Sequence, residues 1–126
     1  MSIKLVTTDK APAPAGHYSQ ATVHNDVVYV AGQLGVVPGT KERKHSVADQ
    51  TEQALRNVQA ILLAAGSDLS RVLRVTVYVV DIAYWKEVNI VYARVFRSHR
   101  PARAVVPCNP LHHGLLVEIE AVAALA

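Results

Sequence analysis

A run of apolar residues between positions 46 and 66 constrains the fold most, because it repeats with helical spacing. The positions that share this apolar face are Ala54, Leu55, Val58, Ile61, Leu62 and Ala65. Ser46, with Asp49 three residues later, resembles a capping box at a helix start, and Gly66 suits the residue just beyond a helix end. A helix with a single apolar face needs a second layer to cover it, and the rest of the chain has to supply that layer.

Strand patterns come before and after this helix. Residues 18–24 and 27–31 predict a hairpin with Asn25-Asp26 as its turn, and Gly32 is expected to end the second strand. Residues 71–80 are rich in β-branched and aromatic side chains, which predicts a third strand. Within it, the valines and the polar side chains alternate between the two faces.

A second helix is expected after this strand, with Asp81 as its cap. Its predicted buried face comprises Trp85, Val88, Tyr92, Val95 and Phe96, and Pro101 lies beyond its end. Two strands, near residues 102–107 and 115–124, complete the chain.

The resulting order is β-β-α-β-α-β-β. It predicts an α+β fold in which two helices pack on one face of a mixed sheet. A length of 126 residues fits a single domain over residues 1–126. A domain of this size leaves much apolar surface uncovered when alone, so we expect it to form an oligomer.

Charge and hydropathy bear on location and partners. The formal charge is +3 and the isoelectric point is about 9.2. The basic residues fall in an apparent loop at residues 41–44 and near the end of the second helix, so nucleic acid is not the expected partner. No targeting segment and no stretch of roughly 20 apolar residues is present, so we expect no membrane association. The lone Cys108 suits a reducing compartment, and a cytoplasmic location is predicted.

Three sets of residues invite chemical hypotheses. Glu118 and Glu120 share one face of the last strand, where they either perform acid–base work or form ion pairs on an exposed or interface surface. Arg103 is either an ion-pair partner or a bidentate anchor for a carboxylate or phosphate. The six histidines have no metal-ligand spacing, so no metal site is predicted. His112-His113 is assigned to a loop that ends at Gly114.

Short motifs in a fixed order carry a resemblance to a known family over nearly the whole chain. In chain order they are Gly16-His17-Tyr18-Ser19-Gln20, Ala31-Gly32-Gln33, Gln53 with Asn57, Ala65-Gly66, residues 76–81, Asn89 with Tyr92 and Phe96, Pro101-Ala102-Arg103, and Glu118-Ile119-Glu120-Ala121. By these motifs the chain resembles the RidA/YjgF family, also called the L-PSP family.

The resemblance implies a chorismate-mutase-like fold assembled as a homotrimer, with pockets between subunits. It also implies an enamine/imine deaminase, which hydrolyses 2-aminoacrylate-derived imines such as 2-iminopropanoate to 2-oxo acids and ammonia without a cofactor or metal. Two alternatives stay open. One is a non-catalytic module that binds small carboxylates, and the other is an RNA-directed endoribonuclease or translation inhibitor.

The resemblance also implies roles for five residues. Arg103 matches the arginine that holds the substrate carboxylate, and Glu118 matches the glutamate that positions or activates the attacking water. Tyr18 matches a pocket tyrosine from the neighbouring subunit. Asn89 matches a helix asparagine that shapes the pocket, and Gly32 offers a backbone amide near the substrate.

The chain departs from the family pattern at three positions. Ala31 stands where a serine is often found, and His17 replaces a proline. Val105 stands two residues after Arg103, where a cysteine is often found. These departures point to altered substrate size, weaker general imine activity or a larger enamine substrate.

Overall fold

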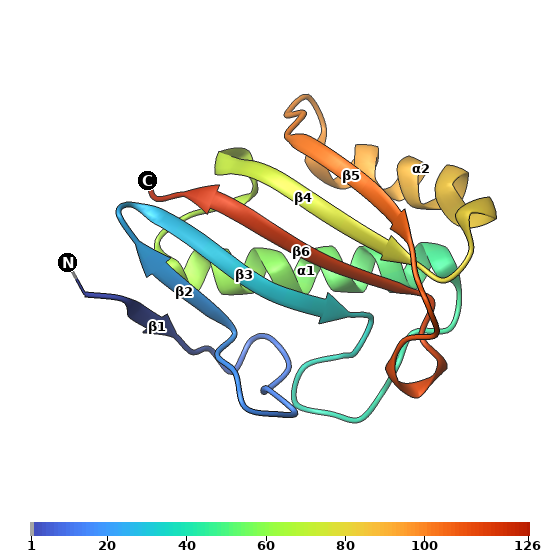
Figure 1. Ribbon diagram of the computed structural model, residues 1–126, viewed down its shortest axis with the longest axis horizontal. Helices are drawn as coiled ribbons and strands as arrows, with labels where there is room; N and C mark the ends of the chain where they lie inside the picture. Colours follow the sequence, from blue (N-terminus) through green and yellow to red (C-terminus); the bar gives the residue numbers. More distant parts are fainter. Residues whose placement is uncertain (1) are drawn as a thin grey trace.

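The computed structural model describes residues 2–126 and arranges them as one sheet and one helical layer (Figure 1). The strands are β1 (Lys4–Val6), β2 (Ala21–His24), β3 (Val27–Leu34), β4 (Val72–Val79), β5 (Ala102–Pro107) and β6 (Val117–Ala124). The helices are α1 (Val47–Ala65) and α2 (Trp85–Phe96). The predicted α+β order is confirmed, with the short strand β1 added before it.

The sheet is mixed, as predicted, and its strand order is β1-β2-β3-β6-β4-β5. Neighbouring strands are antiparallel except β4 and β5, which are parallel and joined through α2. The last strand, β6, therefore lies between β3 and β4, and β1 and β5 form the two edges. This order places β6 in the interior of the sheet.

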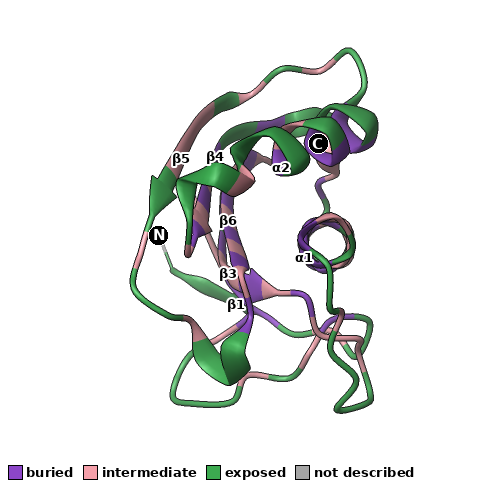
Figure 2. Cartoon of the chain, turned by 90° about the vertical axis from the view of Figure 1, so that its right-hand side faces the viewer, coloured by how far each residue is buried: buried purple, intermediate pink, exposed green. Residues whose placement is uncertain are grey.

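Both helices cover the same face of the sheet, and no element of residues 2–126 covers the other face (Figure 2). The alternation in β4 and β6 explains this arrangement. The valines of β4 and the residues Val117, Ile119, Ala121 and Ala123 of β6 are buried towards the helices. The polar side chains between them point to the other face, which we call the open face.

The ends of α1 follow the predicted capping pattern. The Ser46 hydroxyl oxygen accepts a hydrogen bond of 3.0 Å from the Asp49 amide. Gly66 adopts a left-handed conformation with φ of 89°, which glycine reaches without steric cost. Ser46 is thus confirmed as the residue that caps the start of α1, and Gly66 as the residue just beyond its end.

The β2–β3 turn also forms as predicted. Asn25 and Asp26 both have positive φ, of 51° and 63°, as a two-residue hairpin turn that matches the strand twist requires. The prediction for Gly32 was wrong, because β3 continues to Leu34. The pairing of β3 with β6 shifts between Val30 and Gln33, so Gly32 lies in an irregular part of the strand.

The start of α2 differs from the prediction. The Asp81 carboxylate accepts a hydrogen bond of 2.8 Å from the Ala83 amide and caps a short 3-10 turn that precedes α2. Trp85 is 44% exposed, so its predicted burial was wrong, and Val91 is buried on that face instead. The reason is that Trp85 is the first residue of α2 and lies over an edge-strand side chain rather than over the core.

Neither helix among residues 2–126 combines the length and the hydropathy that crossing a membrane requires.

Candidate functional site

The five residues singled out in the sequence fall into two groups on opposite faces of the sheet. In the parallel pair β4–β5, Arg103 is the register partner of Val75, which is buried under the helices. In the antiparallel pair β4–β6, Glu118 is the partner of Tyr78, which points to the open face. Since register partners share a face and successive residues alternate, Arg103 and Glu118 of one chain do not converge on a common ligand.

The first group surrounds Arg103 between β5 and α2. Its Nη1 atom donates a hydrogen bond of 2.9 Å to the Asn89 side-chain oxygen. Its guanidinium carbon lies 4.6 Å from the ring centroid of Tyr92 and 5.8 Å from that of Trp85, within the range of cation–π attraction. Among residues 2–126, Asn89 is the side chain that accepts a hydrogen bond from Arg103, so other guanidinium N–H donors are available to an anion.

The surroundings of Arg103 are strongly basic. A cavity of about 400 Å³ extends from Arg103 along α2 and is also lined by Arg97 and Arg100. Tyr92 lies below Arg103, and burial raises the pKa of its hydroxyl to about 12, against the opposing effect of the arginine charge. The Tyr92 ring therefore stays neutral at physiological pH and provides an uncharged platform for the guanidinium.

The second group surrounds Glu118 on β6, and β4 separates this strand from the β5 strand that carries Arg103. A cavity of about 470 Å³ is lined by Tyr18, Gly32, Glu118 and Ala31, together with both histidines of the turn His112–Gly114. Tyr18 is 52% exposed, and its hydroxyl oxygen accepts a hydrogen bond of 3.3 Å from the Ala15 amide. The lead-in loop, β3 and β6 thus bring three of the predicted residues together.

Gly32 is in close contact with the Glu118 side chain. A Cβ atom added at Gly32 would lie 2.8 Å from Glu118 Oε2 and 3.0 Å from its carboxyl carbon. These distances are shorter than van der Waals contact, so the absence of a side chain at position 32 lets the carboxylate lie against the backbone of β3. The irregular pairing of β3 occurs at this contact.

Three effects set the pKa of the Glu118 carboxyl. Partial burial raises it, the positive charge of His112 lowers it, and the negative charge of Glu120 raises it, so that the pKa lies above its ordinary value. A carboxylate of raised pKa is a stronger base once ionised, which favours proton abstraction near neutral pH.

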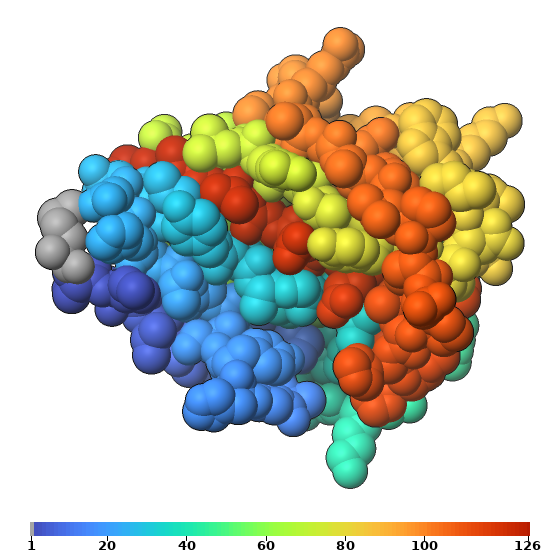
Figure 3. All heavy atoms as spheres, viewed as in Figure 1, coloured from blue at the N-terminus to red at the C-terminus, as the bar shows by residue number. Residues whose placement is uncertain are grey.

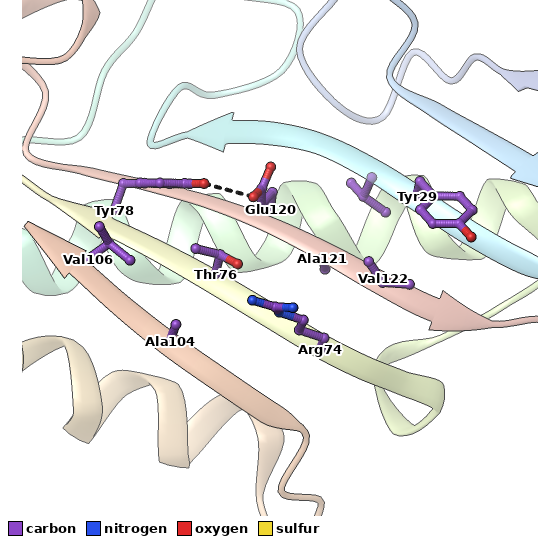
Figure 4. A pocket seen from close by; sticks show the side chains of 10 residues that line it. Tyr29, Arg74, Thr76, Tyr78, Ala104, Val106, Glu120, Ala121 and Val122 are labelled. Atoms are coloured by element: carbon purple, nitrogen blue, oxygen red, sulfur yellow. Dashed lines mark hydrogen bonds between the residues drawn. The ribbon is translucent and has the colours of Figure 1, made fainter. Parts of the chain in front are cut away.

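Glu120 has a different environment from Glu118, although both lie on the open face as predicted. The Tyr78 hydroxyl donates a hydrogen bond of 2.9 Å to Glu120 Oε1 (Figure 4). Glu120 lines a shallow depression of about 590 Å³ in the middle of the open face, together with Arg74 and Thr76. In Figure 3 the atoms of β6 are visible between those of β3 and β4 on this face. The two glutamates therefore do not form a catalytic pair within one cavity.

The three departures from the family pattern lie near both groups. Ala31 lines the cavity of Glu118, and His17 is exposed beside Tyr18. Val105 lies two residues after Arg103 in β5, opposite Val77, and packs against the core. Ala31 thus changes the wall of the Glu118 cavity, whereas Val105 does not line the cavity beside Arg103.

Two neighbours of these groups were missed in the sequence. Trp85 lies beside Arg103 but was assigned to the core, and His112 lines the Glu118 cavity but was assigned to a plain loop. The one available signal for His112 was its position six residues before Glu118. Among residues 2–126, no group of three or more His, Cys, Asp or Glu side chains is arranged to hold a metal ion.

The fold and these two groups define a class of protein. In this class helices cover one face of a sheet, and ionisable side chains lie on both faces of that sheet. Residues 8–125 match the sequence model of a family described as "Endoribonuclease L-PSP". The chain belongs to this L-PSP family, which is also called the RidA/YjgF family.

Curated relatives carry names that describe deamination. The chain is 43% identical over 123 residues to "Reactive Intermediate Deaminase A, chloroplastic" of Arabidopsis thaliana, covering 97% of this chain and 66% of that protein. It is 40% identical over 121 residues to the "2-iminobutanoate/2-iminopropanoate deaminase" of Homo sapiens, covering 95% of this chain and 88% of that protein. These names support a deaminase function for the chain.

Solved structures have the same fold. The crystal structure of yeast Mmf1 matches with a TM-score of 0.95 and 35% identity, over 99% of this chain and 100% of that one. The Escherichia coli protein TdcF, crystallised with bound serine, matches with a TM-score of 0.93 and 33% identity, over 98% of this chain and 99% of that one.

Proposed function

We propose that this protein is a cofactor-independent enamine/imine deaminase. It hydrolyses 2-aminoacrylate-derived imines, such as 2-iminopropanoate, to 2-oxo acids and ammonia. The names of its relatives support the reaction, and the two side-chain groups supply what the reaction needs, a cation for the substrate carboxylate and a base for water.

We further propose that the active site lies between two chains of a homotrimer. The observation that carries this proposal is that Arg103 and Glu118 point to opposite faces of the sheet. One chain provides Arg103 and Asn89, and its neighbour provides Tyr18, Gly32 and Glu118. In this arrangement a single small substrate contacts both groups.

The roles of the residues follow from their chemistry. Arg103 binds the substrate carboxylate through two parallel hydrogen bonds, and Asn89 and the Tyr92 ring keep its guanidinium in one orientation. Glu118 accepts a proton from the water that attacks the imine carbon. The Gly32 amide and the ring of Tyr18 enclose the substrate and hold it in line with this water.

An assay with freshly generated 2-iminopropanoate tests the proposal. An amino-acid oxidase forms the imine, and semicarbazide traps what has not yet been hydrolysed. The wild-type protein should accelerate the decay of the imine, and Arg103→Ala should abolish the acceleration while the assembly stays intact in sedimentation. Arg56→Ala, on the exposed surface of α1, is the matched control.

Two further measurements on the same protein distinguish the deaminase from the two alternative functions. A binding module would be stabilised by 2-oxo acids, as seen in thermal melting, without any acceleration of imine decay. An RNA-directed activity would require RNA binding that weakens steeply with salt, since phosphate contacts dominate such affinity. If the wild-type protein leaves the imine decay rate unchanged, the deaminase proposal is wrong.

A further inference from the structure

The two adjacent histidines of the turn His112–Gly114 have no role in the reaction described so far. Both side chains are exposed, and both line the cavity that contains Glu118. The turn has a defined backbone, with φ of 61° at His113 and 70° at Gly114, and the Leu115 amide donates to the His112 carbonyl at 3.2 Å. The turn therefore places both histidines in the wall of the cavity.

Of these two histidines, His112 is the one coupled to Glu118. Its positive charge lowers the pKa of the Glu118 carboxyl, and burial and Glu120 act in the opposite direction. The other titratable groups near Glu118 are Tyr78 on β4, which feels its charge, and Tyr18 and His113 in the cavity wall. Among residues 2–126, His112 is thus the basic side chain that both lines this cavity and lowers the pKa of Glu118.

We propose that His112 is a second catalytic residue. It gives a proton to the imine nitrogen and later takes the hydroxyl proton of the carbinolamine, while Glu118 takes a proton from the attacking water and passes it to the departing nitrogen. This inference rests on the proposed deaminase function. A histidine at this place suits the reaction, because imine hydrolysis needs a proton on the departing nitrogen as well as a base for water.

The proton transfers balance over two steps. In the first, the water oxygen bonds to the imine carbon, Glu118 takes a proton from the water, and protonated His112 gives a proton to the nitrogen, which yields a neutral carbinolamine. In the second, the carbon–nitrogen bond breaks and its electron pair leaves with the nitrogen, which takes the proton from Glu118 and departs as ammonia. His112 takes the hydroxyl proton as the 2-oxo acid forms, so both residues regain their starting states.

The other residues near the site are poorly suited to this role. An arginine such as Arg103 does not release a proton at physiological pH, and an ordinary tyrosine holds its proton up to about pH 10. An imidazole can both donate and accept a proton within one reaction cycle.

His112→Asn tests the proposal, with His113→Asn as the matched control. His112→Asn should lower kcat by about 10²-fold, the usual size of a general acid contribution. KM should change little, because the carboxylate still binds Arg103. External imidazole should restore part of the activity of His112→Ala, which a merely structural role would not allow.

The pKa of Glu118 gives a readout that does not depend on turnover. In wild-type and variant proteins, 13C NMR of the Glu118 carboxyl should show a higher pKa in His112→Asn, because the stabilising positive charge is lost, and no change in His113→Asn. If His112→Asn has the wild-type kcat and pH profile while Arg103→Ala is inactive, the role of His112 is overturned and the deaminase function stands. If the wild-type protein itself does not hydrolyse the imine, both are overturned. His112→Gln replaces His112→Asn if the latter does not assemble.

Discussion

Gly32 determines where the base of the proposed reaction can lie. Its missing side chain leaves the space that Glu118 Oε2 occupies, at 2.8 Å from the position a Cβ atom would take. The family resemblance suggested a role for the backbone amide of this glycine, and the structure adds a steric one. Both roles belong to the same residue of β3. The effect of a substitution at Gly32 on activity therefore depends on how far it moves the Glu118 carboxylate.

Gly32→Ala should therefore reduce activity more than stability. The new methyl group displaces a flexible carboxylate, and a shift of about 1 Å at a catalytic group is worth up to about 10²-fold in rate. The free energy of unfolding should fall by less than about 1 kcal/mol, since the side chain can move away. Enzyme kinetics and urea unfolding measure the two effects.

Gly35→Ala provides the comparison. A Cβ atom there would lie 2.8 Å from the backbone Cα of Gln50 in α1, which has little freedom to move. This variant should lose more stability than Gly32→Ala does. The reverse order of stabilities would show that Gly32 is needed for folding rather than for the placement of Glu118.

At the scale of whole elements, the parts with a local signal could be predicted and those that depend on distant partners could not. The capped helix α1 and the Asn25-Asp26 hairpin have their start and stop residues within a few positions of the chain. Strand β1 has three residues and exists because β2 pairs with it, so no pattern of its own identifies it. Trp85 was misassigned because its partner, Arg103, belongs to another element.

The candidate site shows the same division. Alternation along the last strand predicted correctly that Glu118 and Glu120 share a face. The face of Arg103 could not be predicted, because it depends on the parallel register that sets Arg103 opposite Val75. The contribution of the 112–114 turn was also missed, since a turn has no periodicity to interpret.

The cap of α1 gives a prediction about an element. Ser46→Ala removes the acceptor of the Asp49 amide and should lower the free energy of unfolding by about 1 kcal/mol, the usual cost of losing such a cap. Ser46→Asp should keep most of the stability, because a carboxylate accepts the same hydrogen bond. Chemical denaturation checks both variants, and equal losses in the two would show that the hydroxyl does not act as a cap.

For the whole molecule, Glu118 should make stability depend on pH. Burial raises its pKa above 4.5, so the folded chain binds this proton more tightly than the unfolded chain. Its contribution to stability is therefore greatest at pH below 4.5 and falls as the pH rises through the folded pKa. Glu118→Gln should melt at a higher temperature than the wild-type protein at neutral pH, and the difference should vanish at acidic pH.

Glu120→Gln is the control for this prediction, because the Glu120 carboxylate accepts a hydrogen bond from Tyr78. The loss of the Glu120 carboxylate should not stabilise the protein at neutral pH. Thermal melts of all three proteins between about pH 4 and pH 8 cover the range in which a carboxyl of raised pKa titrates. A melting difference for Glu118→Gln that is the same at both ends of the range would contradict the assignment of burial as the cause.

Mixing two inactive variants tests whether the site is shared between chains. Arg103→Ala and Glu118→Gln should each be inactive alone. When they are unfolded and refolded together in equal amounts, about a quarter of the sites should receive Arg103 from one variant and Glu118 from the other. Recovery of that fraction of activity is expected, and a mixture as inactive as its components would show that the site lies within one chain.

The placement of Arg103 and Glu118 on opposite faces has a genetic consequence under the proposed arrangement. A chain that lacks one of these residues disables a site completed by its neighbour, while its own remaining residue still serves another site. Two differently damaged alleles in the same cell would therefore complement each other, and a damaged allele beside an intact one would reduce activity in proportion to its share of the chains.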